Sequence, residues 1–410
     1  MTIASPSATG RYAADVAIVG GGLVGGTLAC ALSGLGVATT VIETGDPAAS
    51  LDAGFDGRAS AISLTSRRLL ETAGLWAGMA DEATPMRYIR VTEGASPLYL
   101  DYDHRDVGDE PFGYMVENRH YRCALYERIE RDPNIAFLTR SSAAHVERNA
   151  AGVEIRLAGG AGVHAPLVVA AEGRNSGLRE DAGIRVSGWS YRQVGIVCTV
   201  EHERHHGFVA HERFLPGGPF AILPLKGCRS SIVWTERADR APAIMALDDE
   251  GFTVELARRF GDFLGAVRVV GPRWAYPLSL QFAESATAER LALVGDALHA
   301  MHPIAGQGLN MGLRDVAALS DVLSEARALG LDLGAGDVLA RYQRWRRFDN
   351  TLMLALTDGL NRLFAVDATP VRLARNVGLA AVDALPPLKR FFMRHAMGLV
   401  GELPRSMRGA

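Results

Sequence analysis

Three glycines near the start of the chain, Gly20, Gly22 and Gly25, follow the spacing Gly-x-Gly-x-x-Gly, and an acidic residue, Glu43, comes farther along. Glycines at this spacing let a turn approach a pyrophosphate closely, and a helix that begins at the turn directs its N–H groups at the negative charge. A carboxylate at Glu43 is suited to accept hydrogen bonds from ribose hydroxyls and would repel a 2′-phosphate. The pattern predicts binding of FAD or NAD rather than NADP.

The sequence around these glycines predicts the elements that must position them. Residues 15–19 form an apolar, β-branched run, residues 23–35 have the apolar spacing of a helix, and residues 37–42 form a second β-rich run. A glycine-rich turn can also serve only to let a strand and a helix pack. A complete βαβ unit around the motif favours nucleotide binding over that alternative.

A second segment, from Leu291 to Asp315, favours FAD over NAD. A short apolar run precedes Gly295 and Asp296, and a loop then leads to Gly306-Gln307-Gly308 and Asn310 at the start of a helix. A carboxylate at the end of a strand can accept the hydroxyls of a ribityl chain. Backbone N–H groups at a helix start can face the electron-rich edge of a flavin ring. NAD would leave both groups without a partner.

This second segment resembles the corresponding motif of the class A flavin-dependent aromatic monooxygenases. Its His-Pro-x-x-Gly-Gln-Gly-x-Asn form is similar to that of the ubiquinone-biosynthesis hydroxylases. Residues 56–63, 114–119 and 394–399 resemble the same family, so the resemblance extends along nearly the whole chain. It implies a fold like that of para-hydroxybenzoate hydroxylase, in the α/β class, with a Rossmann-like FAD-binding domain, a mostly antiparallel β-sheet substrate domain and C-terminal helices.

The domain boundaries expected from this resemblance divide the chain into three parts. Residues 1–75, 106–183 and 286–335 would form the FAD-binding domain. Residues 76–105 and 184–285 would form the substrate domain, and residues 336–410 the helical C-terminal region. The alternating apolar runs at 194–200, 208–214, 221–225 and 230–235 predict the strands of the substrate domain.

The resemblance also implies further cofactor-binding residues. Arg58 would run along FAD, and Arg119 would contact its ribityl or phosphate region, although a surface charge at a helix start is an equal alternative for Arg119. A third family motif corresponds to Glu172-Gly173-Arg174, with glutamate where the family has aspartate. Gly173 and Arg174 fit the motif, whereas the longer side chain of Glu172 shifts the carboxylate. For Arg174 the alternative is a solvated charge at a strand end.

The residues expected to form the substrate pocket lie on the predicted antiparallel sheet. We expect its walls to include Phe214, Phe220, Leu223, Pro224 and Trp234, and the alternative for each is a place in the core of the sheet. By the family pattern His302 and Pro303 would lie against the flavin, where His302 or His299 could instead be a loop histidine with its hydrogen bonds satisfied.

The resemblance implies an oxygenase reaction. NAD(P)H would bind transiently as the electron donor, because no second dinucleotide motif is present. Reduced FAD would react with O₂, and a flavin hydroperoxide would hydroxylate the ring of a prenylated phenol in ubiquinone biosynthesis. Two rivals remain: a flavin reductase or halogenase on the same fold, and a non-catalytic flavoprotein scaffold. The absence of a Trp-x-Trp-x-Ile-Pro segment disfavours the halogenase.

One apparent metal motif is rejected. His202-Glu-Arg-His-His206 has the His-Glu-x-x-His pattern of zinc proteases, which place both histidines on one helix face. Here it follows a β-rich run, and in an extended chain the outer rings would stand about 13 Å apart, too far to share a metal. No metal site is expected.

Composition and charge set the remaining expectations. The net charge of −3 with interspersed signs provides no basic field for nucleic acid, and the four scattered cysteines are expected to be reduced thiols of a cytoplasmic protein. The C-terminal region is rich in Lys and Arg, and Leu388, Phe391 and Phe392 share one face of a predicted helix. This helix could lie on an anionic membrane or dock onto other ubiquinone-biosynthesis enzymes, and its alternative is a packing helix with a solvated face.

Overall fold

A parallel sheet forms the centre of the first structural unit of this computed structural model, which describes residues 10–52, 57–94, 99–301, 306–365 and 382–409. Its strands lie in the order β19-β20-β13-β2-β3-β9, and the last five are parallel. Their bounds are Thr287–Ala288, Leu291–Leu293, Leu167–Ala170, Val16–Val19, Thr39–Ile42 and Ile135–Leu138. Strands β20, β13 and β3 are buried at every position, as strands covered on both faces must be.

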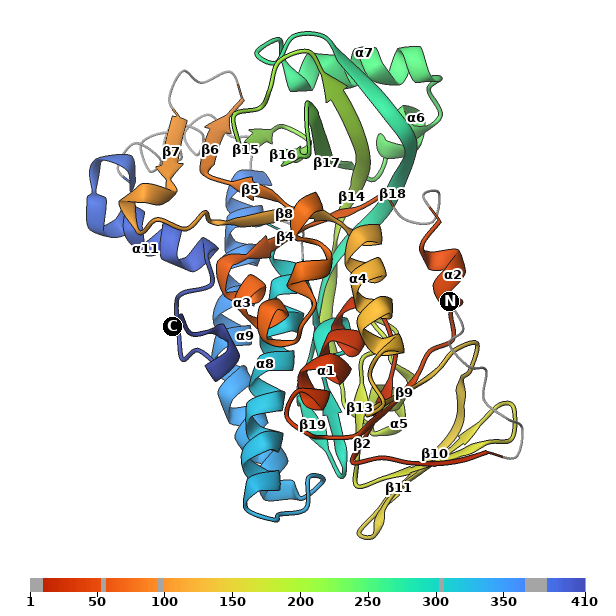
Figure 1. The fold of residues 1–410 in the computed structure, drawn as a ribbon. Coiled ribbons are helices and arrows are strands. Elements are labelled where there is room, and N and C mark those ends of the chain that lie inside the picture. Colours follow the sequence, from red (N-terminus) through yellow and green to blue (C-terminus); the bar gives the residue numbers. More distant parts are fainter. Residues whose placement is uncertain (1–9, 53–56, 95–98, 302–305, 366–381, 410) are drawn as a thin grey trace.

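Helices pack along this sheet and complete the Rossmann-like unit. Helix α1 (Leu23–Ser33) connects β2 to β3, which confirms the predicted βαβ unit, and it packs against α4 (Asn118–Glu130) and α8 (Gln307–Ala328) (Figure 1). Between α1 and α8 the backbones come close, because a Cβ at Gly312 would lie 2.9 Å from the side chain of Val24. The shorter helices of this part are α2 (Pro47–Ser50), α3 (Leu64–Thr72) and α5 (Gly177–Asp181).

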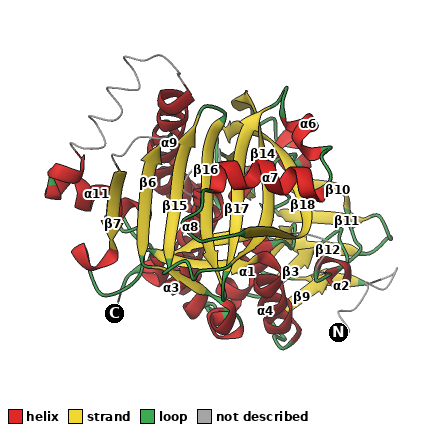
Figure 2. Ribbon diagram, turned by 90° about the horizontal axis from the view of Figure 1, so that it is seen from above, coloured by secondary structure: helices red, strands yellow, loops and turns green. Residues whose placement is uncertain are grey.

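The second unit is a curved, mostly antiparallel sheet whose strands lie in the order β21-β18-β14-β17-β16-β15-β6-β7. Figure 2 shows this sheet from above, with α6 (Ala241–Met245) and α7 (Asp249–Phe260) lying across it. The strands span, in that order, His299–Ala300, Val267–Ala283, Val186–His202, Arg229–Arg237, Gly218–Leu225, Val209–Leu215, Tyr88–Glu93 and Tyr99–Asp103. The expected antiparallel sheet is therefore confirmed.

Two smaller sheets connect these units and extend them. Strands β4 (Ala59–Ser63), β8 (Gly113–Glu117) and β5 (Thr84–Met86) lie beneath the large sheet, and Met115 and Ala61 pack against Ala210 and Leu223 of that sheet. Strands β1 (Arg11–Ala13), β10 (Ala143–Asn149), β11 (Gly152–Leu157) and β12 (Gly162–Ala165) form a separate four-stranded sheet. The exact limits of the three expected parts remain a prediction.

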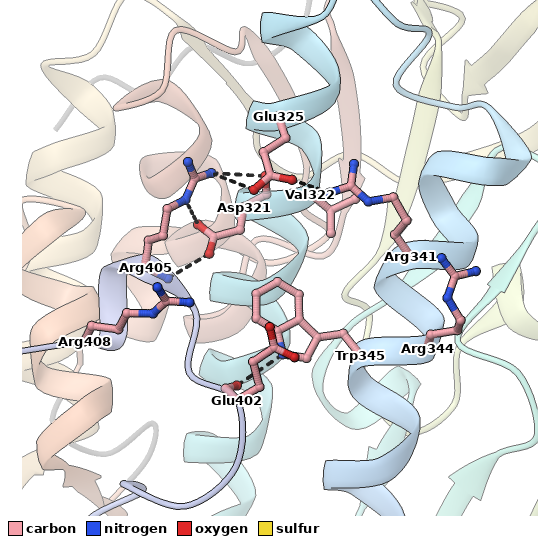
Figure 3. A pocket seen from close by; sticks show the side chains of 9 residues that line it. All are labelled: Asp321, Val322, Glu325, Arg341, Arg344, Trp345, Glu402, Arg405 and Arg408. Atoms are coloured by element: carbon pink, nitrogen blue, oxygen red, sulfur yellow. Dashed lines mark hydrogen bonds and ion pairs between the residues drawn. The ribbon is translucent and has the colours of Figure 1, made fainter.

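The C-terminal region returns along the first structural unit. Helix α9 (Gly336–Ala365) packs on α8, and α11 (Pro386–Ala396) is fixed by Met393 and Met397, which pack against Leu64 and Phe112. Figure 3 shows Arg405 of the last segment paired with Asp321 and Glu325 of α8. A hollow of about 500 Å³ lies there, lined by Asp321, Val322, Glu325, Arg341, Arg344, Trp345, Glu402, Arg405 and Arg408. No helix of the described residues is long and apolar enough to cross a bilayer.

Candidate FAD site

Four predicted cofactor segments meet at one edge of the parallel sheet. Gly20 follows β2, Glu43 follows β3, Glu172 follows β13 and Gly295 follows β20, and these four strands are neighbours in the order β20-β13-β2-β3. Carboxyl ends of parallel strands share one edge, and this edge is where dinucleotides bind in open α/β sheets. Segments that are up to about 275 residues apart in sequence (20 to 295) are thereby brought together.

The glycine turn is packed so closely that side chains are excluded at two of its three positions. A Cβ at Gly20, whose φ is +101°, would lie 2.4 Å from the carbonyl oxygen of Ala171, and one at Gly25 would lie 1.9 Å from that of Gly20. At Gly22 a Cβ would meet no atom within 4 Å. Gly22 caps α1 without any side-chain hydrogen bond, so the N-terminus of the helix faces open space. This is the arrangement that a pyrophosphate requires.

Glu43 is positioned beside that turn by the backbone. Its two carboxylate oxygens accept hydrogen bonds from the N–H groups of Gly21 and Gly45, each at 2.6 Å. These bonds fix the orientation of the carboxylate and leave further lone pairs for ribose hydroxyls. Binding of the ribose by Glu43 stays a prediction.

Asp296 is a single exposed residue within a buried segment. Gly295 and Ala297 on either side are buried, and Gly295 has a φ of +60°. In the part of the chain that the structure describes, the Asp296 carboxylate has no hydrogen bond or ion pair. A carboxylate that is presented at the end of a strand without a protein partner fits the ribityl hydroxyls of FAD.

The first turn of α8 carries the residues that are predicted to contact the flavin ring. Gly306 caps the helix with a φ of +62° in close contact with Ala61, and a Cβ at Gly308 would meet no atom within 4 Å. The contact of Asn310 with the cofactor stays a prediction, and its side chain bonds to the protein. Its amide donates to the carbonyl oxygens of Ala61 (2.8 Å) and Gly306 (3.2 Å), and its Oδ1 accepts from the N–H of Ser63 at 2.9 Å. Asn310 thus fastens α8 to β4. Gln307 is the first residue of α8.

In the third motif, the side chain of Glu172 bonds to the start of α5. Glu172 Oε1 accepts from the N–H of Gly177 at 2.6 Å, so the carboxylate helps to cap α5, and Oε2 is buried without a partner within the described part of the chain. Burial raises the pKa of Glu172. Gly173 has a φ of +86°, and Arg174 donates to Ser279 Oγ of β18 at 2.7 Å. Arg174 therefore connects the two units instead of projecting freely into solvent.

Arg58 and Arg119 lie near each other at the junction of the two units. The N–H of Asn118, at the start of α4, donates to the carbonyl of Arg58 at 3.0 Å. The guanidinium of Arg58 lies 5.1 Å from the ring centre of Tyr276 on β18. Arg119 Nη2 is 3.8 Å from a Glu117 oxygen, a weak ion pair in which neither side chain is fully buried. The arrangement places both arginines near the region between the sheets.

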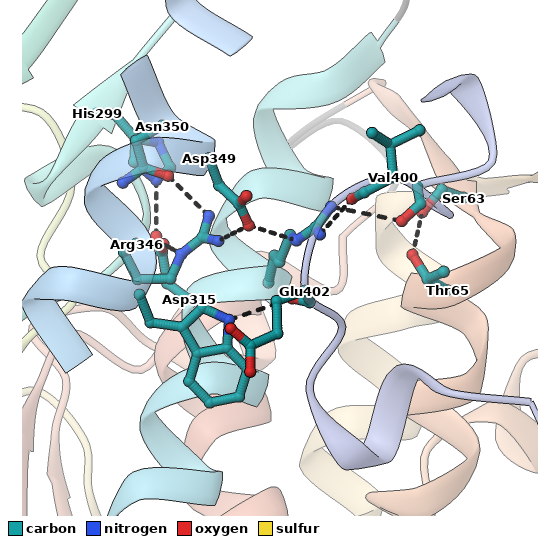
Figure 4. A network of polar contacts seen from close by, with 12 residues as sticks. Ser63, Thr65, His299, Asp315, Arg346, Asp349, Asn350, Val400 and Glu402 are labelled. Carbon is teal, nitrogen blue, oxygen red and sulfur yellow. Dashed lines mark hydrogen bonds and ion pairs between the residues drawn. The ribbon is translucent and has the colours of Figure 1, made fainter. Parts of the chain in front are cut away.

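A buried charge network behind the Gly295 turn was not predicted. One oxygen of Asp315 accepts from the N–H of Gly295 (3.0 Å) and lies 2.7 Å from His299 Nε2, and the other accepts from Arg346 Nε at 2.7 Å (Figure 4). Burial alone would raise the pKa of Asp315, but His299 and Arg346 outweigh it and lower this pKa. The network holds the turn that presents Asp296. His302 and Pro303 lie outside the described residues.

The five predicted pocket residues are divided between the two faces of the large sheet. Phe220 and Trp234 are fully buried against α7, with the Trp234 ring 5.8 Å from that of Phe252. This places them in the core behind the sheet, away from the FAD-binding unit. Leu223 packs toward β4 and β8. By the alternation of side chains, Phe214 shares the face of Ala210, whereas Pro224 shares that of Phe220. Sequence alternation could not show which face α7 covers.

The rejected metal motif has a geometry that differs from the expected one. The rings of His202 and His206 are 5.9 Å apart rather than about 13 Å, because the chain leaves β14 at His202 and bends before Gly207. Both rings are hydrogen-bonded: His202 to Arg204 O and Ser230 Oγ, and His206 to Leu225 O. Burial lowers the pKa of both rings. Two of the four free cysteines, Cys30 and Cys198, are buried.

Comparison with known proteins gives an independent assignment. Residues 13–347 match the family model described as an FAD binding domain. The chain is 54% identical to a ubiquinone hydroxylase of Rhodospirillum rubrum over 98% of this chain and 96% of that protein. It is 38% identical to the 3-demethoxyubiquinol 3-hydroxylase of Escherichia coli over 94% of this chain and 98% of that protein.

The fold comparison agrees with these sequence matches. The structure of a p-nitrophenol 4-monooxygenase from Pseudomonas putida superposes with a TM-score of 0.80, covering 96% of this chain and 100% of that one at 20% identity. That likeness shows the same fold, and the predicted fold class is confirmed. With a matching family model and similar relatives over nearly its whole length, the chain belongs to the family of FAD-dependent monooxygenases that includes the ubiquinone hydroxylases.

Proposed function

We propose that this protein hydroxylates the aromatic ring of a prenylated phenol intermediate in ubiquinone biosynthesis, with NAD(P)H as electron donor and O₂ as oxidant. The observation that carries the proposal is the exposed Asp296, which has no partner among the described residues and lies at the strand edge shared with the Gly20 turn. The named activities of the relatives support the substrate class. FAD, once reduced, supplies the chemistry that activates O₂.

The residues of the chain have binding and positioning roles in this proposal. The Gly20–Gly25 turn and the N-terminus of α1 would hold the pyrophosphate, Glu43 the ribose, and Asp296 the ribityl chain. Backbone N–H groups from Gly306 to Gly308 would face the flavin ring, and Arg58, Arg119, Gly173 and Arg174 would line the approach to it. The apolar underside of the large sheet would exclude water from the ring to be hydroxylated.

The function is tested with purified protein reconstituted with FAD. We expect substrate-dependent oxidation of NAD(P)H, and one atom of ¹⁸O from ¹⁸O₂ in a hydroxylated prenylphenol identified by mass spectrometry. NAD(P)H oxidation without oxygen insertion would instead indicate a reductase. FAD binding with neither reaction would indicate a scaffold. Feeding a strain that lacks the gene and identifying the accumulated quinone precursor would establish which ring position is used.

We also propose that helix α11 brings the enzyme to the cytoplasmic face of a membrane, where a prenylated substrate resides. Leu385, Leu388, Phe391 and Phe392 are exposed by 52%, 38%, 47% and 36%, an apolar concentration on a single helix. The exposed Arg390 and Arg394 lie beside them on the helix. Apolar side chains flanked by cations are typical of helices that bind anionic lipid. The alternative is that α11 docks onto another biosynthetic enzyme, and vesicle flotation distinguishes the two roles.

A further inference from the structure

Strand β15 presents its alternate residues to two different environments. His211 and Arg213 point toward α7: Arg213 Nη1 donates to the carbonyl oxygen of Phe260 at 2.9 Å, and the His211 ring is 4.7 Å from that of Phe263. Ala210 packs on the opposite side, with Met115 of β8. Because side chains alternate along a strand, Glu212 must share the face of Ala210, which looks toward the FAD-binding unit.

Glu212 is the ionisable member of an otherwise apolar row across the sheet. The register pairs Glu212 with Val91 of β6 on one side and with Ala221 of β16 on the other. The row continues through Val233 of β17 and Val197 of β14. It ends at Trp274 of β18, whose ring contacts the backbone of Gly57 beneath the sheet. The row therefore crosses the face under which the aromatic substrate is expected.

The protein supplies no partner for this carboxyl group. Among the residues that the structure describes, Glu212 has no hydrogen bond and no ion pair, although protein surrounds it and it keeps some accessible surface. Arg90, His211 and Arg213 lie on the other face of the sheet, and Glu93 lies two residues beyond Val91 on the same face. Loss of water is the cause that raises the pKa of Glu212 to about 7. A carboxyl group left unpaired in such a position costs free energy unless a ligand satisfies it.

We propose that Glu212 binds the phenolic hydroxyl group of the substrate and accepts its proton during hydroxylation. The substrate O–H bond breaks, an O–H bond forms on the carboxylate, and the electron pair stays on the phenolate oxygen, where it enriches the ortho and para carbons of the ring. The overall reaction consumes O₂, a hydride from the nicotinamide donor, which brings two electrons and one proton, and one further proton. Glu212 releases the proton again when the second oxygen atom of O₂ takes up protons and leaves as water. This inference rests on the proposed function and assigns a residue to it.

Binding to the oxidised holoenzyme tests the proposal without turnover. We would titrate 2-geranylphenol and its methyl ether against the wild type, Glu212→Leu, Glu212→Gln and the control Glu201→Gln, following flavin fluorescence at pH 5.5 and 8. A hydrogen bond to a charged group should favour the phenol by about tenfold in the wild type at pH 8. The preference should shrink at pH 5.5, when the carboxyl group is protonated, and should vanish in Glu212→Leu at both pH values.

The glutamine variant separates proton transfer from binding. Its amide oxygen still accepts the hydroxyl hydrogen, so part of the preference should remain, whereas hydroxylation should slow at least tenfold and NAD(P)H oxidation should yield H₂O₂ instead. An unchanged phenol preference in Glu212→Leu would overturn the inference, as would an absent preference in the wild type. If the wild type makes the hydroxylated product but Glu212→Leu keeps the same phenol preference, only the role of Glu212 is refuted and the proposed function stands. A wild type that makes no product would refute the function itself.

Discussion

At the scale of single residues, a substitution at Asp296 should weaken FAD binding without changing the stability of the apoprotein. Its carboxylate has no partner within the described ranges, so Asp296→Asn should leave the unfolding of the apoprotein unchanged. It should weaken FAD binding by about tenfold or more, since a hydrogen bond to a charged group contributes about 1.5–3 kcal/mol. Titration of FAD by fluorescence measures this loss. Asp262→Asn, an exposed site beyond α7, is the matched control, and equal affinities in the two variants would contradict the assignment.

Glu212 should make stability depend on pH in a direction opposite to that of most carboxylates. Its pKa is about 7 in the folded chain against an ordinary value of 4.5. The native state therefore holds a proton that the unfolded state releases, and stability falls as pH rises from about 4.5 to 7. The loss above pH 7 approaches about 3 kcal/mol at most, less what residual solvent screens.

Replacing this carboxyl group should remove that dependence. Glu212→Gln should be more stable than the wild type at pH 8, and the difference should disappear near pH 4.5. Denaturant unfolding of the two apoproteins across this range measures it. A constant difference between the proteins at all pH values would show that the Glu212 carboxyl group is not buried as the strand alternation requires.

At the scale of elements, the start of α1 offers a matched pair of glycines. Gly25→Ala should destabilise the fold by about 1–3 kcal/mol, because its methyl group would overlap the Gly20 carbonyl at 1.9 Å. Gly22→Ala has an allowed backbone (φ −69°, ψ −168°) and open space, so the fold should keep its stability while FAD affinity drops. Thermal unfolding of the apoproteins and FAD titration separate the two effects. A stable Gly25→Ala, or a Gly22→Ala that binds FAD normally, would contradict this packing.

The buried network joins α8, α9 and the Gly295 turn. Arg346→Met removes one partner of the fully buried Asp315 and should cost about 3–5 kcal/mol of stability. The turn that presents Asp296 should loosen, so FAD should also dissociate faster. Arg344→Met, two residues away on an exposed face of α9, is the control. If both variants unfolded at the same temperature, the network would carry no stability.

The cofactor elements could be predicted because each motif residue lies within two residues of the end of its own strand. Gly20 and Glu43 directly follow β2 and β3. Glu172 and Gly295 follow β13 and β20 after one further apolar residue. The face of a side chain in the large sheet could not be predicted for Phe220 or Trp234, because it depends on the helix that covers the sheet. The roles of Asn310 and Glu172 also depend on distant partners, the β4 backbone and the start of α5.

At the scale of the whole molecule, the hollow beside α8 is separate from the cofactor edge. Asp321 is 14 residues beyond Gln307, about 20 Å along the helix. Several charged side chains that line the hollow form ion pairs with one another: Arg405 pairs with Asp321, and Arg341 pairs with Glu325. The Arg405 pair fastens the C-terminal segment to α8, and the Arg341 pair fastens α9 to α8. Met407 of the C-terminal segment is buried in the main core. The segment thereby holds α11 on the outside of the molecule.

The proposed membrane attachment would depend on this whole arrangement. Met393 and Met397 anchor one side of α11 in the protein, and Phe391 and Phe392 remain on its exposed side. The holoenzyme should therefore float with vesicles that contain anionic lipid, and less with zwitterionic vesicles or at high salt. Phe391→Ser/Phe392→Ser should abolish flotation while leaving FAD content and turnover of a short-chain phenol unchanged. Val254→Ser, at an equally exposed apolar residue on α7, should float normally. If the wild-type protein stayed at the bottom of the gradient, membrane attachment would be refuted, and the exposed face of α11 would be assigned to contact with another protein.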